Sequence, residues 1–531
     1  MITSSRRSTL LSGFLSGLYA LLPRVKPVVA KPFDRKKTLV VAINADPVGI
    51  DPAMNRAEPI GSEIIINIFD TLVVASSDDS TQVEGRLAAN WSISPDGLHY
   101  SFTLVKNVYF HDNTPVDAQS VKFSIERTRR LNPFAKSSFI KIRNIEVVDS
   151  LTVDFYLSSP VPFFLSLLGQ PHAAIVSPQA VRSLGEDFSR FPVGSGSFRF
   201  QRYKPEVGLT LTGNPAYFRG RPSIDRLVYS IITDASTRHM ELERAEIDIC
   251  QQNAQLSALS MADIQSFSSN PDIKIIEKSS QILRQLEFNN LRTDGPVSDI
   301  RVRKAITHAI DYDGLVHHIL AGTVDRVYGP LPSVSWAFTH EIRSSSPDYS
   351  PAKARALLHE AGWVSYQKKL SLITFEGSFW AAVATFIQSN LAAVGIDVTI
   401  EQMEFPSLRA RHIAGMFDMA LDGREPWYSD PDAHITIGYL STLARSAMTF
   451  RMPADQRLDN LIRVAQSEQK EDVRKSLYDQ IQRTVLDRVP AAYLFTNKII
   501  IFQRREVEGL VVRTTPPLNE YWSVVKQDGS P

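Results

Sequence analysis

Hydrophobic and polar positions alternate most clearly between residues 87 and 125. Three apolar residues in this segment are separated by single polar ones, which is the period of a half-buried strand: Tyr100, Phe102 and Leu104. The Pro-Asp-Gly sequence at residues 95–97 favours a turn before that strand. After a second polar break, Asp117 can cap a helix. The apolar face of this helix carries Ala118, Val121 and Ile125. The segment therefore predicts strand, turn, strand, turn and helix.

Similar patterns predict strands and helices mixed along the whole chain. Strands are indicated at residues 39–43, after a glycine-rich turn within 194–200, at 209–211 and at 396–400. Helices are indicated at residues 302–310 after a cap at Asp299, at 354–361 after Ser350-Pro351 and before Gly362, and at 379–394 before Gly395. This mixture argues for an α/β or α+β architecture.

The first 30 residues differ from the rest of the chain. They contain four basic residues, no acidic residue and a weakly apolar run at residues 10–22. A membrane-spanning helix needs about 20 apolar residues, so this shorter run fits the apolar region of a cleavable export signal. Arg6-Arg7 resembles a twin-arginine export motif, and the small residues before position 31 predict cleavage after Ala30. An ordinary signal that happens to contain two arginines is the alternative.

Composition places the chain among globular proteins. The full 531 residues include 43% hydrophobic and 22% charged side chains, and this length argues for two or three domains. The net charge is +1 without a basic stripe, so we expect no nucleic-acid partner. The single cysteine, Cys250, lies in an apolar run and is expected in the core. No cysteine near the leader could carry a lipid anchor, and no later segment could span a membrane, so we expect a soluble periplasmic protein.

Local catalytic and metal-binding motifs are incomplete. Residues 340–341 and 359–360 begin like a zinc-protease helix, but no histidine follows at the required spacing. Residues 193–197 lack the order of a nucleophile elbow, and His317-His318 would point about 100° apart on a helix. We therefore expect no enzyme activity, metal or cofactor. An exported hydrolase with residues assembled from distant segments is the alternative from another class.

The residue order of the first segment resembles a family marker. The solute-binding proteins that serve peptide and nickel ABC importers carry the same residue types at the same spacing. The matching residues are Ala88, Trp91, Ser94, Asp96, Gly97, Tyr100, Phe102, Leu104, Val108, Phe110, His111, Asp112, Pro115, Ala118, Val121 and Phe123. Residues 214–222, 286–311 and 349–363 match further family segments. The resemblance thus covers essentially the whole mature chain.

The resemblance implies an α/β, two-lobed periplasmic binding protein of the type II-like large cluster, with an extra inserted domain. Lobe I would comprise residues 31–75, 191–285 and 499–531, the inserted domain residues 76–190, and lobe II residues 286–498. The implied function is that of a monomeric periplasmic substrate-binding subunit of an ABC importer, which captures peptides between the lobes and delivers them to membrane permeases and their ATPases. The same role for a nickel chelate, an opine or a glycan is the alternative.

The resemblance also implies where a ligand would bind. An extended peptide would lie between the lobes and pair its backbone with a short segment of each lobe, as in strand addition. The lobe II segment would be Gly423, Arg424 and Glu425. The approximate lobe I counterpart is Arg56, Ala57 and Glu58. Arg409 and Arg411 are candidates for binding a ligand carboxylate.

This chain departs from the family pattern just after the lobe II segment. The family form is roughly G-W-x-x-D-Y-x-(D/E)-P, in which the first aspartate takes the peptide's α-ammonium. Here Trp427 replaces that aspartate, while Tyr428, Asp430 and Pro431 hold their places. A desolvated ammonium needs a carboxylate, and Glu425 or Asp430 could supply it. Alternatively the ligand lacks a free α-amine and Trp427 stacks on it or forms a cation–π contact, or Trp427 simply packs within lobe II.

Overall fold

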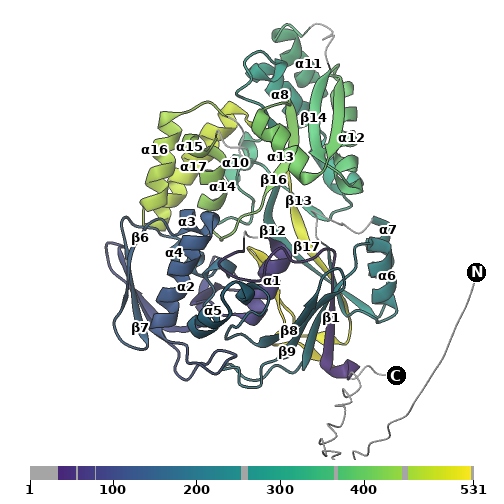
Figure 1. Ribbon diagram of the computed structural model, residues 1–531. Helices are drawn as coiled ribbons and strands as arrows, with labels where there is room; N and C mark the ends of the chain where they lie inside the picture. The colour runs from purple at the N-terminus through teal and green to yellow at the C-terminus, as the bar shows by residue number, and fades with distance from the viewer. Residues whose placement is uncertain are drawn as a thin grey trace, which may run out of the picture. The chain divides into compact units, whose positions relative to one another are not determined.

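The structure is a computed structural model that describes residues 34–55, 58–77, 79, 81–252, 261–363, 369–444 and 452–527. Residues from Arg35 onward form one compact unit of mixed helices and strands (Figure 1). The predicted export signal, its cleavage site, Arg56 and Ala57 lie outside the described residues. We keep the names lobe I, inserted domain and lobe II for the predicted ranges, whose boundaries stay predictions.

One large mixed sheet organises the molecule, in the strand order β15-β14-β16-β12-β17-β11-β1-β10-β9-β8, with β13 beside β17. The strands are β1 (Thr38–Ile43), β8 (Phe198–Lys204), β9 (Gly208–Gly213), β10 (Arg226–Ile231), β11 (Ile249–Gln252), β12 (Ile273–Phe288), β13 (Val324–Arg326), β14 (Leu370–Phe375), β15 (Val398–Met403), β16 (Met419–Arg424) and β17 (Ala491–Arg504). The predicted first strand is confirmed as β1, and the predicted strand pair near residues 200 and 210 is confirmed as β8 and β9.

Two long antiparallel strands, β12 and β17, run through both halves of this sheet (Figure 1). The last part of β17 lies between the first part of β12 and the lobe I strand β11, whereas the last part of β12 pairs with β16 of lobe II. The ladder between them shifts register between Ser279 and Leu283. Such irregularities weaken the ladder locally and bend the strand. The place where the chain passes between the lobes is therefore the least regular part of this pair.

The lobe I part of the sheet is buried on both faces. Alternate residues of β1 point to opposite sides, so Leu39 and Val41 pack with α1 (Pro59–Ile68), and Ala42 packs on the side of α6 (Ala235–Glu243) and α7 (Met261–Ser269). Cys250 of β11 is buried on this second side, as predicted.

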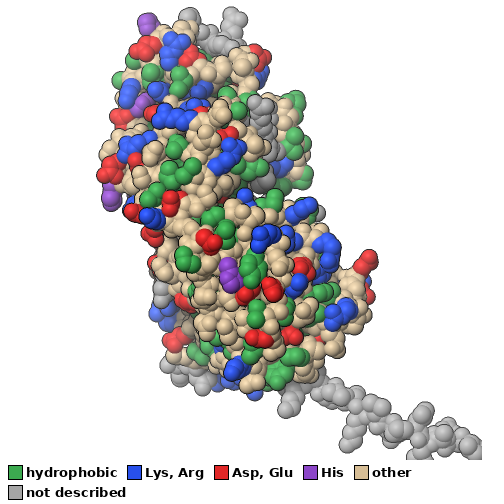
Figure 2. All heavy atoms as spheres, turned by 90° about the vertical axis from the view of Figure 1, so that its left-hand side faces the viewer, with side chains coloured by type: hydrophobic (Ala, Val, Ile, Leu, Met, Phe, Trp, Pro, Cys, Tyr) green, Lys and Arg blue, Asp and Glu red, His purple; other side chains and the backbone are tan. Residues whose placement is uncertain are grey.

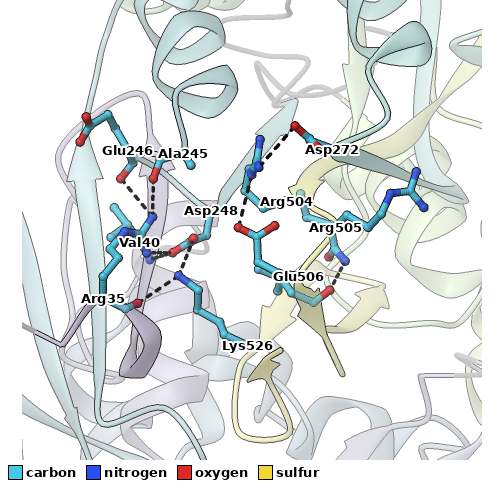
Figure 3. Close-up of polar contacts among 12 residues, drawn as sticks. Arg35, Val40, Ala245, Glu246, Asp248, Asp272, Arg504, Arg505, Glu506 and Lys526 are labelled. Carbon is cyan, nitrogen blue, oxygen red and sulfur yellow. Dashed lines mark hydrogen bonds and ion pairs between the residues drawn. The ribbon is translucent and has the colours of Figure 1, made fainter. Parts of the chain in front are cut away.

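A buried carboxylate joins the first and last strands of the described chain. Asp248 accepts hydrogen bonds from the Arg35 guanidinium at 2.6 Å, the Lys526 ammonium at 2.8 Å and the Val40 backbone N–H at 2.7 Å (Figure 3). Lys526 lies on β21 (Val525–Lys526), which pairs with β18 (Val507–Glu508). The second C-terminal hairpin consists of β19 (Val511–Thr514) and β20 (Pro517–Glu520).

The inserted domain has its own antiparallel sheet, in the order β4-β5-β7-β6. These strands are β4 (Ala88–Ile93), β5 (His99–Leu104), β6 (Ile142–Val147) and β7 (Thr152–Leu157), and the neighbouring elements are β2 (Val73–Ala75), β3 (Val83–Gly85), α2 (Ala118–Leu131), α3 (Pro133–Ser138), α4 (Phe164–Leu168) and α5 (Pro178–Leu184). The alternating residues Tyr100, Phe102 and Leu104 are buried in β5, as predicted. Helix α2 begins after Asp117, whose side chain accepts a hydrogen bond from the Ser120 N–H.

Lobe II packs helices on both faces of its strands. The helices are α8 (Ile300–Ala309), α9 (Tyr312–Gly314), α10 (His340–Ser345), α11 (Pro351–Glu360), α12 (Ser378–Ala392), α13 (Phe405–Ala414), α14 (Asp432–Tyr439), α15 (Ser441–Ala444), α16 (Gln456–Ser467) and α17 (Glu471–Arg488). Helices α8, α11 and α12 cover one face, and α13, α14, α16 and α17 cover the other. The predicted caps Asp299 and Ser350 are confirmed at α8 and α11.

The surface agrees with the nearly neutral composition. Acidic and basic side chains are interspersed over the face shown in Figure 2, which includes parts of lobe II and the inserted domain. None of the helices in the described ranges combines the length and the apolar character that crossing a bilayer requires.

Candidate ligand-binding site

The candidate site begins at the end of strand β16. Strands β14, β15 and β16 are mutually parallel, so their carboxyl ends meet at one edge of the lobe II sheet. Ligands of open α/β sheets bind outside such an edge. β16 pairs with β14 only as far as Leu421, whereas Gly423 and Arg424 pair with β12 alone. Among the described strands, none occupies the other edge of Gly423 and Arg424, two residues of the predicted backbone-pairing segment.

Position 423 has no room for a side chain, because the Leu283 carbonyl and the Arg284 side chain lie against it. An added Cβ would lie 2.3 Å from the Leu283 carbonyl oxygen and 2.5 Å from the Arg284 guanidinium. Arg284 is almost fully buried, and its Nε donates a hydrogen bond to the Asn497 amide oxygen at 2.8 Å. The absence of a side chain at position 423 thus makes room for a buried arginine at the end of the sheet.

Glu425 forms an ion pair with that arginine. The distance from Arg284 Nη2 to Glu425 Oε1 is 3.1 Å, and the Glu425 side chain is 18% exposed. The Arg284 guanidinium also lies 5.5 Å from the ring centroid of Trp380. The Glu425 carboxylate therefore compensates a buried protein cation.

Asp430 forms a second buried pair, with Arg474 of α17. The two groups meet fork to fork at 2.8 and 3.0 Å, and each side chain is only 6% exposed. Burial alone would lower the pKa of the Arg474 guanidinium, but the Asp430 carboxylate raises it above its ordinary value. The bidentate geometry is the strong form of this interaction, so Asp430 is held in place by Arg474.

Tyr428 reaches the inserted domain. Its ring stacks on Phe163 with centroids 5.2 Å apart and planes 12° apart. Its hydroxyl donates to the Asp432 carboxylate at 2.7 Å, and burial, followed by that carboxylate, raises the pKa of Tyr428 well above its ordinary value. In the same loop, the Gln281 amide donates to the Ser429 hydroxyl at 3.0 Å. The loop after β16 therefore touches α17, the inserted domain and the irregular part of β12.

Trp427 lies partly buried within this loop, between the two paired carboxylates in sequence. The tyrosine and aspartate that follow it are engaged with Phe163 and Arg474. The ligand-binding roles of Gly423, Arg424, Glu425, Trp427, Tyr428 and Asp430 stay predictions.

The two arginines considered for a ligand carboxylate are paired within lobe II. Arg409 lies 2.6 Å from Asp422, and Arg411 lies 3.0 Å from Glu401. Burial would raise the pKa of Asp422, but Arg409, followed by His412, lowers it below its ordinary value. These contacts favour a structural role for both arginines.

One buried group has the residue types of a metal site. Ligand atoms of Glu287, His412 and Asp422 lie within 4.8 Å of one another. The Arg409 guanidinium lies 2.6 Å from Asp422 and 3.3 Å from the Nδ1 atom of His412. A guanidinium in that position repels a second cation and already neutralises the aspartate, so these residues form a charge network that fits a metal ion poorly.

On the lobe I side, Glu58 caps helix α1. Its carboxylate accepts hydrogen bonds from the backbone N–H groups of Ile60 at 2.8 Å and Gly61 at 2.6 Å. Burial raises the pKa of Glu58. The cap position accounts for an acidic residue before Pro59, and the ligand-binding role of Glu58 stays a prediction.

Sequence reasoning missed the partners of the loop. Arg284, Arg474 and Phe163 lie 141, 44 and 265 positions away from the residues that they contact. The sequence around Arg284 mixes polar and apolar residues, so its burial in the second half of β12 has no clear local signal.

Comparison with known proteins identifies the family. The model of the bacterial extracellular solute-binding proteins, family 5 Middle, matches residues 82–443. The chain belongs to family 5 of the bacterial extracellular solute-binding proteins. The match includes the segment around β5 and α2 and the loop after β16, and it confirms the resemblance on which the fold prediction rests.

Relatives of this family 5 protein align over nearly their full length. The probable D,D-dipeptide-binding periplasmic protein DdpA of Escherichia coli strain K12 is 28% identical, with 96% of this chain and 98% of the relative covered. Di/tripeptide-binding protein 2 of Pseudomonas aeruginosa strain UCBPP-PA14 is 29% identical, with 93% and 95% covered. Both are named as binding proteins.

A solved structure shows the same architecture. The ABC transporter-associated periplasmic binding protein DppA from Helicobacter pylori, in complex with the peptide STSA, is 27% identical to this chain. The alignment has a TM-score of 0.78 and covers 92% of this chain and 98% of the other. The predicted two-lobed α/β periplasmic binding protein fold is thereby confirmed.

Proposed function

We propose that this protein is the periplasmic substrate-binding subunit of an ABC importer, and that it captures peptides between its lobes. The observation that carries the proposal is the end of β16, where Gly423 and Arg424 pair with β12 alone. An extended peptide can add to such an edge through its backbone, which gives affinity without reading side chains. Family membership and the names of the relatives support peptides as the ligand class.

The mechanism would be capture followed by closure. Strands β12 and β17 connect the lobes, and the register shift near Ser279 is a natural place for bending. A ligand that contacts both lobes favours the closed form by its differential affinity. The closed protein would then dock, as a monomer, on inner-membrane permeases that work with their ATPases. No reaction is part of this cycle.

The decisive experiment is mass spectrometry of whatever the purified protein releases on denaturation. Recovery of peptides supports the proposal, whereas a nickel chelate, an opine or a glycan would replace the peptide assignment. Incubation with peptides tests the rival enzyme class, because a binder gains thermal stability with intact ligand. The appearance of cleavage products would instead indicate a hydrolase.

The leader offers a separate test of the compartment. Replacing Arg6 and Arg7 with lysines should retain the protein in the cytoplasm if export uses the twin-arginine route. Cell fractionation followed by immunoblotting measures this directly. Unchanged arrival in the periplasm would favour the general export route, and a wild-type protein that never reaches the periplasm would contradict the proposed location.

A further inference from the structure

We propose that the ligand of this protein carries no free α-ammonium where it meets residues 423–432. The inference rests on the proposed function, because it assumes that these residues contact a captured peptide. It deepens that function by naming the class of peptide: one whose amino end is acylated or closed into an amide.

Each acidic side chain of this segment is already engaged. Glu425 pairs with Arg284 at 3.1 Å, and Asp430 pairs with Arg474 at 2.8 Å. Asp432 is 3% exposed and accepts hydrogen bonds from the hydroxyls of Tyr428 and Thr436. Within β16 itself, Asp422 is paired with Arg409 at 2.6 Å. No carboxylate of residues 419–439, all of which the structure describes, stands without such a partner.

Asp432 is a poor alternative because of its surroundings. Burial is the main influence that raises its pKa, and the neighbouring Asp430 carboxylate raises it further. The oxygens of Asp432 already accept hydrogen bonds from the Tyr428 and Thr436 hydroxyls, and its side chain is almost fully buried. Asp432 is therefore poorly placed to replace the missing aspartate.

Recruiting a paired carboxylate would create a new uncompensated charge. If Asp430 turned to a ligand ammonium, the buried Arg474 guanidinium would lose the carboxylate that compensates it, and Glu425 stands in the same relation to Arg284. Breaking a buried ion pair from one side is strongly unfavourable. The segment therefore tolerates a neutral ligand end far better than a positively charged one.

The remaining acids at this edge of the sheet are exposed to water. Glu376 follows β14 and Glu404 follows β15, and both side chains are exposed. Exposed carboxylates are screened and contribute little to pairing. Position 427 carries an aromatic side chain in place of a carboxylate, and such a side chain suits an acyl group or an amide plane.

Matched peptide pairs test the inference in the wild-type protein. A set of dipeptides and tripeptides is prepared with free and with N-acetylated amino ends, and the thermal shift of each pair is measured. We expect the N-acetylated members to bind about tenfold or more tightly than their free counterparts, since an uncompensated buried charge is expensive. Equal or tighter binding of the free-amine peptides would overturn the inference and leave the peptide function intact.

A gain-of-function variant tests the cause. Trp427→Asp supplies a carboxylate at the position of interest, and we expect its affinity for free-amine peptides to rise about tenfold. The matched control is Trp427→Asn. Asparagine is nearly the same size as aspartate but carries no charge, so this variant should show no rise in affinity. An equal rise in both variants, or no rise in a folded Trp427→Asp, would contradict the charge argument. If Trp427→Asp does not fold, the inference is tested by the matched peptide pairs with the wild-type protein and by the natural cargo.

The natural cargo separates failure of the inference from failure of the proposed function. Molecules released on denaturation are treated with an amine-reactive label. Tandem mass spectrometry then shows which atom of each molecule carries the label. Label on the α-nitrogen of a peptide overturns the inference alone. A cargo that is not a peptide overturns the proposed function. Such a cargo also removes the inferred class of peptide, because that inference assumes a captured peptide.

Discussion

At the scale of single residues, the loop after β16 is defined by charge compensation. Arg284 and Arg474 are buried arginines whose partners, Glu425 and Asp430, come from the same short loop. Such pairs fix the loop's position, because losing either partner leaves a buried charge unpaired. The loop is thus held by its side chains at both ends, and Trp427 lies between these two fixed points in sequence.

Asp430→Asn should destabilise the protein by about 3 kcal/mol or more, because it leaves the Arg474 guanidinium buried without a carboxylate. Urea unfolding gives the free energy of unfolding for the variant and the wild type. The matched control is Asp225→Asn in the exposed pair with Arg221, whose side chains are 50% and 62% exposed. That substitution should change stability by less than about 1 kcal/mol, and similar losses in both variants would contradict the structural role of Asp430.

Glu63 predicts a pH dependence of stability. Burial raises its pKa from 4.5 to about 7, although the Tyr521 hydroxyl and the Asn519 N–H donate hydrogen bonds to it. The native state therefore binds this proton more tightly than the unfolded state does. The stabilisation is complete below about pH 4.5 and is lost as the pH rises towards 7, by up to about 1.4 kcal/mol per pH unit.

Glu63→Gln should remove that part of the slope, because glutamine does not titrate and the Tyr521 hydroxyl can accept its N–H. Urea unfolding between pH 5 and pH 7.5 measures the slope for the variant and for the exposed control Glu186→Gln. A wild-type slope that persists in Glu63→Gln would show that another group carries the pH dependence.

At the scale of elements, β12 and the loop after β16 connect three parts of the fold. β12 leaves the lobe I part of the sheet, shifts register near Ser279 and becomes the partner of β16. The loop that follows β16 returns to β12 through Ser429 and Gln281 and touches the inserted domain through Tyr428 and Phe163. A change in this loop therefore acts on the connection between lobes as well as on the candidate site.

The stacked pair Phe163–Tyr428 should show a measurable coupling energy. We expect about 1 kcal/mol in a double-mutant cycle of Phe163→Leu and Tyr428→Leu, which is the range for aromatic pairs beyond area burial. Urea unfolding of the four proteins supplies the cycle. A coupling near zero would show that the inserted domain and lobe II do not form this contact in solution.

At the scale of the whole molecule, the inserted domain and lobe II meet beside the predicted ligand edge. Phe163 comes from the inserted domain, and it contacts both Tyr428 and, at 5.9 Å from its ring centroid, the Arg474 guanidinium. A contact of this kind restricts any movement that separates the two parts. Retention of a captured ligand should therefore depend on it.

Linking the two parts covalently should slow ligand exchange at least about tenfold, because release requires the lobes to separate. The experiment uses Phe163→Cys together with Tyr428→Cys, bridged by a short bifunctional methanethiosulfonate that reduction removes. The one native cysteine, Cys250, is buried and should not react. The two single variants serve as controls, and equal exchange rates in the bridged and reduced protein would contradict the idea.

How much could be predicted from the sequence depended on whether the signal was local. The alternation at Tyr100, Phe102 and Leu104 predicted β5, and the cap at Asp117 predicted α2, because strand period and capping involve neighbours in the chain. The relation of Glu425 and Asp430 to arginines could not be read in this way, since those partners lie far away in sequence.

The sequence by itself determined the family and the fold, because a long ordered set of residue matches and the local periodicities can both be recognised from the order of residues alone. It also located the departure at Trp427. Only the tertiary structure decided which of the surrounding carboxylates are paired with protein cations. The reason is that the fold determines which charged side chains lie against a buried acid. Arg284 and Arg474, brought there by β12 and α17, pair with the two acids that the sequence offers for a ligand ammonium.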